Sequence, residues 1–147
     1  MRKYHRLVTA LAAVASFATV APAPALAQSE VHLIAHVPFA FSVSDTNLPS
    51  DTYRLSRMNG HREMIVVRGV QTGALVRTDE VRLPRTNVEP SLVFHRYGDQ
   101  YFLREIRWED TARLDLPETR AERNAVERPA NRAAARMETV VVTASPR

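Results

Sequence analysis

The stretch Leu92-Val-Phe-His-Arg-Tyr-Gly-Asp-Gln-Tyr-Phe-Leu103 joins two strand-forming runs through a Gly-Asp pair. A type II′ turn needs a positive φ angle at its first central position, and glycine adopts that angle without strain. The stretch is therefore predicted to be a β-hairpin in which His95 lies opposite Phe102. It also holds a histidine, an arginine and two tyrosines, so the directions of these side chains decide whether they form a site.

Side chains that follow one another along a strand point to opposite faces of the sheet. His95 and Tyr97 therefore share one face while Arg96 points to the other, which argues against a convergent His-Arg-Tyr site. The second strand is expected to be apolar on both faces, with Phe102, Ile106 and Trp108 on one and Tyr101 and Leu103 on the other. Such a strand is predicted to lie in the interior of the fold.

The segment Glu30 to Val43 alternates with a period of two, which is typical of a half-buried strand. Its odd positions are Val31, Leu33, Ala35, Val37, Phe39, Phe41 and Val43. Pro38 has no N–H and predicts a bend or a place on a sheet edge. A second strand, Thr52 to Met58, carries Tyr53 and Leu55 on one face, and Asn59-Gly60 favours a type I′ turn into Glu63 to Arg68.

Strands spaced every 8 to 12 residues with turn signals between them predict an antiparallel β-sandwich or a partly open barrel of about six to eight strands in residues 28–117. Thr119 and Glu122 have the spacing of a capping box, which predicts a short helix within residues 118–128 that ends before Pro129. Residues 129–147 are expected to be a flexible tail.

The chain begins with a basic segment and an apolar run from Leu7 to Val20, followed by Ala25-Leu-Ala27. This order is typical of a secretion signal, and residues 1–27 are interpreted as a signal peptide cleaved after Ala27. The mature chain is therefore expected in the periplasm or outside the cell. It contains no second long apolar run, so no transmembrane segment is predicted in it.

Removal of the signal leaves 17 arginines, no lysine and 16 acidic residues. A net charge near +1 argues against nucleic acid as a partner, because nucleic-acid binding needs a concentrated basic face. The chain has no cysteine, which excludes disulfides, thiol chemistry and cysteine-ligated zinc.

Histidines and acidic residues offer the remaining candidates for metal binding or catalysis. His32 and His36 share a strand face but are separated by about 13 Å of extended chain, too far to bind one metal ion. The acid pairs Asp79-Glu80 and Glu109-Asp110 lie in predicted turns, where solvated loop residues are commoner than a glycosidase couple. No nucleophile elbow, metalloprotease motif or phosphate-binding loop is found. No metal, cofactor or catalytic residue is therefore assigned.

The tail from Glu138 to Ala144 resembles the TonB box, a short segment of outer-membrane receptors that adds as a strand to the periplasmic protein TonB. A β-branched segment is suited to strand addition because its backbone supplies the hydrogen bonds. Here, however, the segment is carboxy-terminal and no receptor barrel follows it. The residues expected to form the partner strand are Thr139, Val140, Val141, Val142 and Thr143.

Three segments, Val37 to Val43, Leu48 to Leu55 and Leu92 to Leu103, resemble a family of small exported β-rich proteins of soil bacteria whose function is not established. The likeness covers residues 31 to about 128. Asp51 stands where such proteins usually carry glycine. The resemblance implies a fold and an exported location, and it supplies no activity, cofactor or site residue.

Two classes of function follow. The first is a non-catalytic envelope domain that binds a partner protein, a glycan or an apolar ligand, with His95, Tyr97, Trp108 and Tyr53 as candidate binding residues. The alternative is a small periplasmic hydrolase. A site with His95, Tyr97 and an acid within hydrogen-bond reach would favour the hydrolase. A flat surface with Trp108 exposed beside Tyr53 would favour binding.

Overall fold

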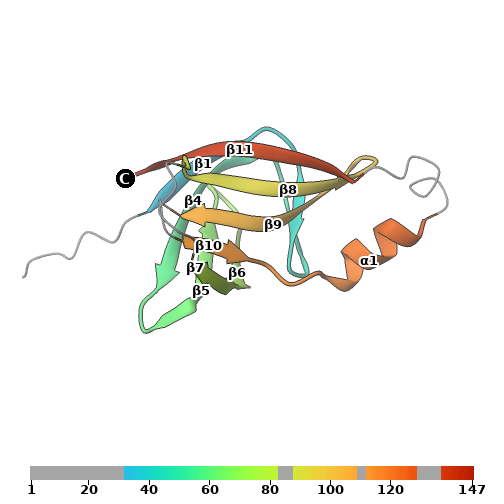
Figure 1. Cartoon of the computed structure of the whole chain (residues 1–147). Coiled ribbons are helices and arrows are strands. Elements are labelled where there is room, and N and C mark those ends of the chain that lie inside the picture. The colour runs from blue at the N-terminus through green and yellow to red at the C-terminus, as the bar shows by residue number, and fades with distance from the viewer. Residues whose placement is uncertain (1–31, 83–87, 109–111, 129–136) are drawn as a thin grey trace, which may run out of the picture.

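The computed structural model describes residues 32–82, 88–108, 112–128 and 137–147 (Figure 1). The predicted signal peptide and its cleavage site lie outside the described residues. Within them, no helix is both long and apolar enough to cross a membrane. In chain order the elements are β1 (Leu33–Val37), β2 (Phe41–Val43), β3 (Thr46–Leu48), β4 (Asp51–Met58), β5 (His61–Arg68), β6 (Gly73–Arg77), β7 (Asp79–Arg82), β8 (Ser91–Tyr97), β9 (Gln100–Trp108), β10 (Ala112–Asp115), α1 (Arg120–Glu127) and β11 (Glu138–Pro146).

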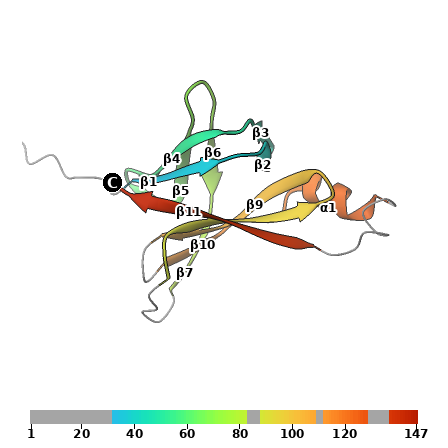
Figure 2. The same ribbon diagram turned by 90° about the horizontal axis from the view of Figure 1, so that it is seen from above.

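The strands form one nearly closed, barrel-like sheet with the order β3-β2-β9-β8-β11-β1-β4-β5-β6, and β10 links β9 to β7 (Figures 1 and 2). The prediction of an all-β fold with a short helix near the carboxyl terminus is confirmed. There are more strands than expected because β3, β10 and β11 were not predicted and because two long segments bend. One breaks at Pro38, so that β1 pairs with β4 while β2 pairs with β3 and β9. The other breaks at Thr78, between β6 and β7.

The core lies inside the sheet and is filled by the inward side chains of alternating strands. Leu33, Ala35 and Val37 are buried, as the period of two predicted for the first segment. On β4, Leu55 is buried opposite Leu33 and Tyr53 opposite Ala35. The largest fully buried apolar side chains are Tyr53, Phe41, Phe94, Leu33, Leu48, Leu55, Ile65, Leu92, Ile106, Leu114 and Val37.

The β8–β9 hairpin has the predicted register, with His95 opposite Phe102 and Gly98 at a φ angle of +61°. Its two faces, however, differ from the prediction. Val93 pairs with Glu105 and Phe94 with Leu103, so Arg104 is an extra residue on β9. A bulge of one residue exchanges the faces beyond it.

Because of this bulge, Tyr101 and Leu103 share the core face with Ile106 and Trp108, while Phe102 lies outside the core cluster. The assignment of Phe102 to the same face as Ile106 and Trp108 is therefore wrong.

The Asn59-Gly60 turn joins β4 to β5 as predicted, with Met58 opposite His61. Gly60 has a φ angle of +81°, but Asn59 is not among the described residues with positive φ. The type I′ assignment, which requires two positive φ angles, is therefore wrong. The ladder shifts register between Arg57 and Met58, and this irregularity supplies the local twist that a type I′ turn would otherwise provide.

The carboxy-terminal segment is the largest departure from the sequence prediction. Residues 138–146 form β11, which pairs with β8 on one side and β1 on the other (Figure 2). The prediction of a flexible tail is wrong for this part, and residues 129–136 lie outside the described residues. The physical reason is a long-range one: the run Val140–Val142 favours a strand, and the fold places two strand edges beside it.

Candidate functional site

His95 and Tyr97 do converge on an acid, which comes from α1. Glu122 Oε1 lies 3.2 Å from His95 Nδ1 and accepts a hydrogen bond from the Tyr97 hydroxyl at 3.4 Å. Arg104, the bulged residue, donates from Nη1 to Glu122 Oε2 at 3.3 Å. As predicted, the hydroxyl of Thr119 caps the helix by accepting from the Glu122 N–H at 3.1 Å. The Glu122 carboxylate, however, binds the sheet instead of closing the capping box.

This arrangement, which we call the Glu122 cluster, ties α1 to the hairpin. The Glu122 side chain is only 2% exposed, and all three neighbouring groups are directed at its carboxylate. Arg104 Nε is buried with no hydrogen-bond partner among the described residues, so its guanidinium depends on Glu122 for charge compensation. A general base needs a free lone pair that faces the substrate. This carboxylate is instead covered and fully engaged.

The Tyr97 hydroxyl has a raised pKa because burial disfavours the phenolate and because Glu122 adds negative charge nearby. Tyr97 is therefore a neutral hydrogen-bond donor in this cluster. Arg96 points away, as the strand alternation predicted: it pairs with Glu138 at 3.1 Å, and its guanidinium lies over the Tyr101 ring.

The aromatic pair proposed for binding is not on the surface. Tyr53 is 0% and Trp108 5% exposed. The Tyr53 hydroxyl donates to the carbonyl of Pro49, burial raises the pKa of that hydroxyl, and its ring packs edge-on against Phe41. Arg57 lies over the Trp108 ring. The flat aromatic surface that would favour binding is therefore absent at these two positions, because both rings belong to the core.

The other predicted site residues are also engaged within the chain. Thr139, Val140, Val141, Val142 and Thr143 pair with β8 from His95 back to Ser91, so they are not a free partner strand. His36 Nδ1 lies 3.2 Å from Thr52 Oγ1, and the described residues hold no group of three or more potential metal ligands. Glu80 pairs with Arg57, while Glu109 and Asp110 lie outside the described residues.

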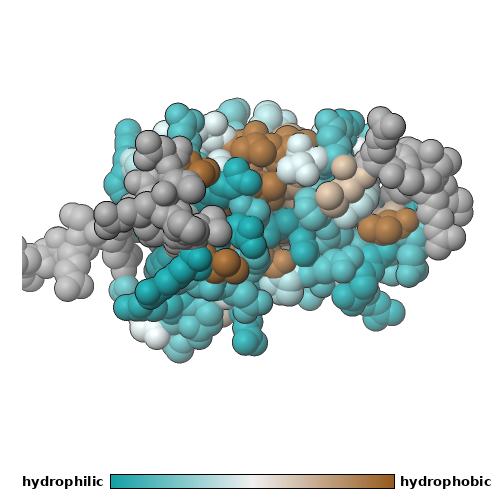
Figure 3. All heavy atoms as spheres, in the orientation of Figure 1, coloured by the Kyte–Doolittle hydropathy of each residue, from teal (hydrophilic) through white to brown (hydrophobic). Residues whose placement is uncertain are grey.

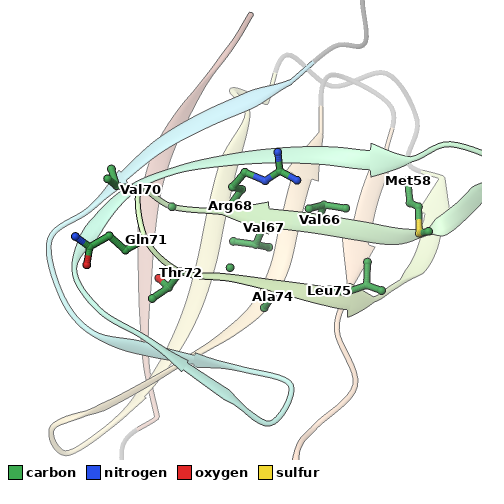
Figure 4. A pocket seen from close by; sticks show the side chains of 11 residues that line it. Met58, Val66, Val67, Arg68, Val70, Gln71, Thr72, Ala74 and Leu75 are labelled. Atoms are coloured by element: carbon green, nitrogen blue, oxygen red, sulfur yellow. The ribbon is translucent and has the colours of Figure 1, made fainter.

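A different part of the sheet has side chains without partners. On β5 and β6, Ile65, Val67 and Val76 are buried, so the intervening Val66 and Leu75 point outward and face each other across the ladder. A groove of about 630 Å³ lies over this outer surface, and Figure 4 shows its side chains coming from three neighbouring strands. Three of its apolar lining residues are well exposed: Met58 by 41%, Leu75 by 51% and Val70 by 82%.

Arginines lie beside these apolar side chains. Arg54 and Arg68 are directly opposite each other on β4 and β5, both exposed. Neither has an ion pair or hydrogen bond to a side chain within the described parts of the chain. A second hollow of about 270 Å³, lined by Ile34 and both arginines, adjoins the groove at Arg68, Gly69 and Val70. Like charges opposite each other destabilise a ladder, so this pair is suited to an anion from outside.

The β5–β6 turn that borders the groove is held rigidly. Asp51 Oδ2 accepts a hydrogen bond from the Val70 N–H at 2.8 Å, and the Gly69 N–H donates to the carbonyl of Thr72 at 2.7 Å. A Cβ at Gly69 would lie 2.7 Å from Asp51 Oδ2 and 2.8 Å from Tyr53 Cε1. A larger residue at position 69 would have to displace the Asp51 carboxylate or the buried Tyr53 ring, so the turn needs glycine there.

At the end of the sheet, β6 pairs with β5 and with no second strand among the described residues. Its other edge offers backbone donors and acceptors to an added strand. The groove, the arginines and this edge form what we call the β6 surface. The sequence indicated this surface through the apolar run from Met64 to Val67, which places apolar side chains on both faces of β5. A strand with only one buried face needs apolar residues at every second position alone.

No family model matches this chain, and searches of curated proteins and of solved structures gave no significant match. The resemblance to small exported β-rich proteins stays a prediction. The site must therefore be interpreted from its own geometry.

Proposed function

We propose that this protein is a non-catalytic envelope domain that binds an extended, acidic and apolar segment of a partner protein at the β6 surface. The observation that carries the proposal is the combination of exposed Val70 and Leu75 with the unpaired Arg68 beside a strand edge. The expected location in the envelope rests on the secretion signal that the sequence predicts for residues 1–27.

Each feature of the β6 surface corresponds to one part of such a ligand. The strand edge pairs with a peptide backbone, and the side chains on one face of that peptide meet the β6 surface. Apolar side chains on that face enter the groove, and carboxylates on the same face bind the guanidinium groups. The groove volume of about 630 Å³ is within the range of ligand sites. Its open shape suits a segment that crosses the surface better than a small molecule that must be enclosed.

The Glu122 cluster meets the distance criterion that favours the hydrolase alternative, but its burial argues against that role. Its histidine and tyrosine have the proximity that a catalytic site needs, but they are directed at a carboxylate that is 2% exposed. A carboxylate this deeply buried is not open to a substrate. We assign the cluster a structural role.

The test is a fluorescence-anisotropy titration of the mature chain, residues 28–147. The probe is a labelled decapeptide in which every second residue is threonine and the positions between carry valine and aspartate in turn. Valine and aspartate then share the face of an added strand that meets the groove and the arginines. The comparison peptide carries lysine at every aspartate position. We expect saturable binding of the acidic peptide only. Binding of both peptides to the same extent, or of neither at millimolar protein, would contradict the proposal.

A matched pair of variants locates the binding. Leu75→Glu places a charge in the groove, whereas Val141→Glu places one on β11 at a side chain that is equally exposed, at 52%. We expect Leu75→Glu to weaken binding about tenfold or more, the loss of one buried apolar contact plus added repulsion, and Val141→Glu to leave binding unchanged. Equal losses would place the peptide elsewhere.

A further inference from the structure

Three rows of paired residues cross the ladder between β5 and β6. The pairs are Arg68 with Gly73, Val66 with Leu75 and Met64 with Arg77. Val76, between the last two rows, is buried, so strand alternation places Leu75 and Arg77 on the outward face. Because β6 is the last strand in the sheet order of the described residues, a strand added at its edge continues these three rows.

The two outer rows carry cations without internal partners. Arg77 is exposed and, like Arg68, has no ion pair or hydrogen bond to a side chain within the parts of the chain that the structure describes. The outward positions of the three rows, with the two that continue them on β4, include no acidic residue. They are Arg54, Ser56, Met64, Val66, Arg68, Gly73, Leu75 and Arg77. A carboxylate from outside therefore meets no competing acid in these rows.

Gly73 keeps the row of Arg68 open toward the edge. A Cβ at this position would lie 2.8 Å from the Val67 carbonyl oxygen, so the strand needs glycine there. Neighbouring strands are about 4.8 Å apart, and the exposed Arg68 side chain can turn across that width because Gly73 has no side chain. An acid opposite Gly73 is therefore within reach of Arg68, and an acid opposite Arg77 meets that residue directly.

The middle row is apolar. Leu75 is 51% exposed and Val66, opposite it, is half-buried, and both line the groove. A carboxylate opposite Leu75 would lose water without gaining a charge partner, whereas an apolar side chain there covers Leu75. Along the β6 edge, a cation, an apolar position and a second cation thus follow one another at every second residue.

A second exposed apolar region lacks this pattern. Val141 is 52% exposed, on a face where Figure 3 shows apolar side chains over β11 and β8. The positions that share this face on the two paired strands contain no arginine. They are Ser91, Val93, His95, Thr139 and Thr143. That region can cover an apolar side chain, but it has no arginine to pair with an acid beside it.

We propose that the β6 surface selects segments in which an apolar residue lies between two acidic residues, separated from each by one residue of any type. This inference rests on the proposed function and specifies its ligand. The segment adds antiparallel to β6, as β5 does, because antiparallel pairing is the more stable. Its first acid then lies opposite Arg77, its apolar residue opposite Leu75, and its second acid opposite Gly73, where Arg68 binds it. The two intervening residues point to the other face.

The test compares two labelled peptides of identical composition and charge by fluorescence-anisotropy titration with the mature chain, residues 28–147. The ordered peptide is Thr-Glu-Thr-Val-Thr-Glu-Thr, and the rearranged peptide is Thr-Val-Thr-Glu-Thr-Glu-Thr. In any register, the rearranged peptide can match only two of the three rows. We expect it to bind about fivefold more weakly, the loss of one exposed ion pair.

Two peptides with a single acid assign each arginine to its row. Thr-Glu-Thr-Val-Thr-Gln-Thr keeps the first acid, and Thr-Gln-Thr-Val-Thr-Glu-Thr keeps the second. We expect Arg77→Gln to weaken binding of the first peptide only and Arg68→Gln to weaken binding of the second only, each about fivefold. Arg120→Gln removes the same charge from an exposed position on α1 and should weaken neither.

The outcomes separate this inference from the proposed function. Equal affinity for the ordered and rearranged peptides would overturn the inference, as would equal weakening of both single-acid peptides by Arg68→Gln and Arg77→Gln. Either result leaves the proposed function standing if the chain still binds acidic peptides and not the lysine peptide. Absence of binding to every acidic peptide would overturn both. The comparison of ordered and rearranged peptides uses the unaltered chain, so it decides even if an arginine variant does not fold.

Discussion

The β8–β9 and β5–β6 hairpins carry similar residue types, but these side chains have partners within the chain in the first hairpin and lack them in the second. Both carry arginines and apolar side chains outside the main core. In β8–β9, Arg104 is directed at Glu122 of α1, whose carboxylate is buried. In β5–β6, Arg68 faces Arg54, and no helix or strand of the described chain covers Val70 or Leu75.

The difference shows that residue types alone do not identify a functional site. A histidine, a tyrosine, an arginine and a glutamate look catalytic as a set, yet their contacts are directed at one another and hold α1 in place. The groove contains no residue of obvious chemistry, yet its charges and apolar surface lack internal partners. Availability for contact, more than chemical reactivity, separates the two hairpins.

The largest expected effect comes from breaking the Glu122 cluster. Glu122→Ala removes the carboxylate that compensates Arg104, and we expect the free energy of unfolding to fall by about 3 kcal/mol, the low end for a broken buried pair. Urea titration followed by circular dichroism measures it. Glu127→Ala, an exposed position on the same helix, is the control and should change it by less than about 0.5 kcal/mol. A similar loss in both variants would mean that the cluster does not anchor α1.

A smaller loss is expected from the turn that frames the groove. Gly69→Ala forces a Cβ against Asp51 and the buried ring of Tyr53, and overpacking of this kind costs about 2 kcal/mol. Gly60→Ala is the matched control, because its Cβ has open space but its φ angle is positive, which costs about 1 kcal/mol. Thermal unfolding of the two variants should preserve this order. The reverse order would show that the turn is not rigid.

A still smaller effect on stability is expected from Tyr97 of the β8–β9 hairpin at alkaline pH. The pKa of Tyr97 is raised in the folded state, so the unfolded chain loses this proton at a lower pH than the folded chain does. The contribution of the Tyr97 proton to the free energy of unfolding is therefore fully present below about pH 10 and is lost at higher pH. Tyr97→Phe should therefore show a shallower loss of stability than the unaltered chain between about pH 9 and pH 11. Tyr53 also has a raised pKa, so part of the loss remains. If urea titrations at each pH showed the same decline of stability with pH in both chains, the burial of Tyr97 would be contradicted.

The smallest effect on stability is expected at the tip of the groove. Val70 is 82% exposed, so Val70→Ser should change the free energy of unfolding by less than about 0.5 kcal/mol. The same change should measurably weaken binding of the valine–aspartate peptide. A stable variant with full affinity would exclude Val70 from the β6 surface.

Local pattern predicted the parts of the fold that depend on local physics. Three features could be predicted from the sequence, because each depends on residues a few positions apart. They are the alternation from Leu33 to Val43, the hairpin register at His95 and the Thr119 cap. The faces of β9 could not be predicted, since a single bulge at Arg104 exchanges them and no residue type signals it. The assignment of Tyr97 to the His95 face held, because it lies on the hairpin side of that bulge.

Long-range neighbours explain the remaining errors. Whether residues 138–146 are ordered depends on strand edges that the chain forms far upstream, at β1 and β8. Likewise, the burial of Tyr53 and Trp108 depends on the closure of the whole sheet, which local pattern does not show. Both residues were therefore candidates for an exposed surface. Glu122 was legible as a capping residue, whereas its contacts with the hairpin required the position of α1.

The most direct test of the difference between the hairpins is the change in unfolding free energy for the matched variants Arg68→Gln and Arg104→Gln, measured by urea titration. If the charge of Arg104 belongs to the fold and that of Arg68 is free for a partner, Arg104→Gln should lose about 2 kcal/mol. Arg68→Gln should raise the free energy of unfolding by about 0.3 kcal/mol, because the repulsion from Arg54 is relieved. Equal losses in the two variants would contradict the account.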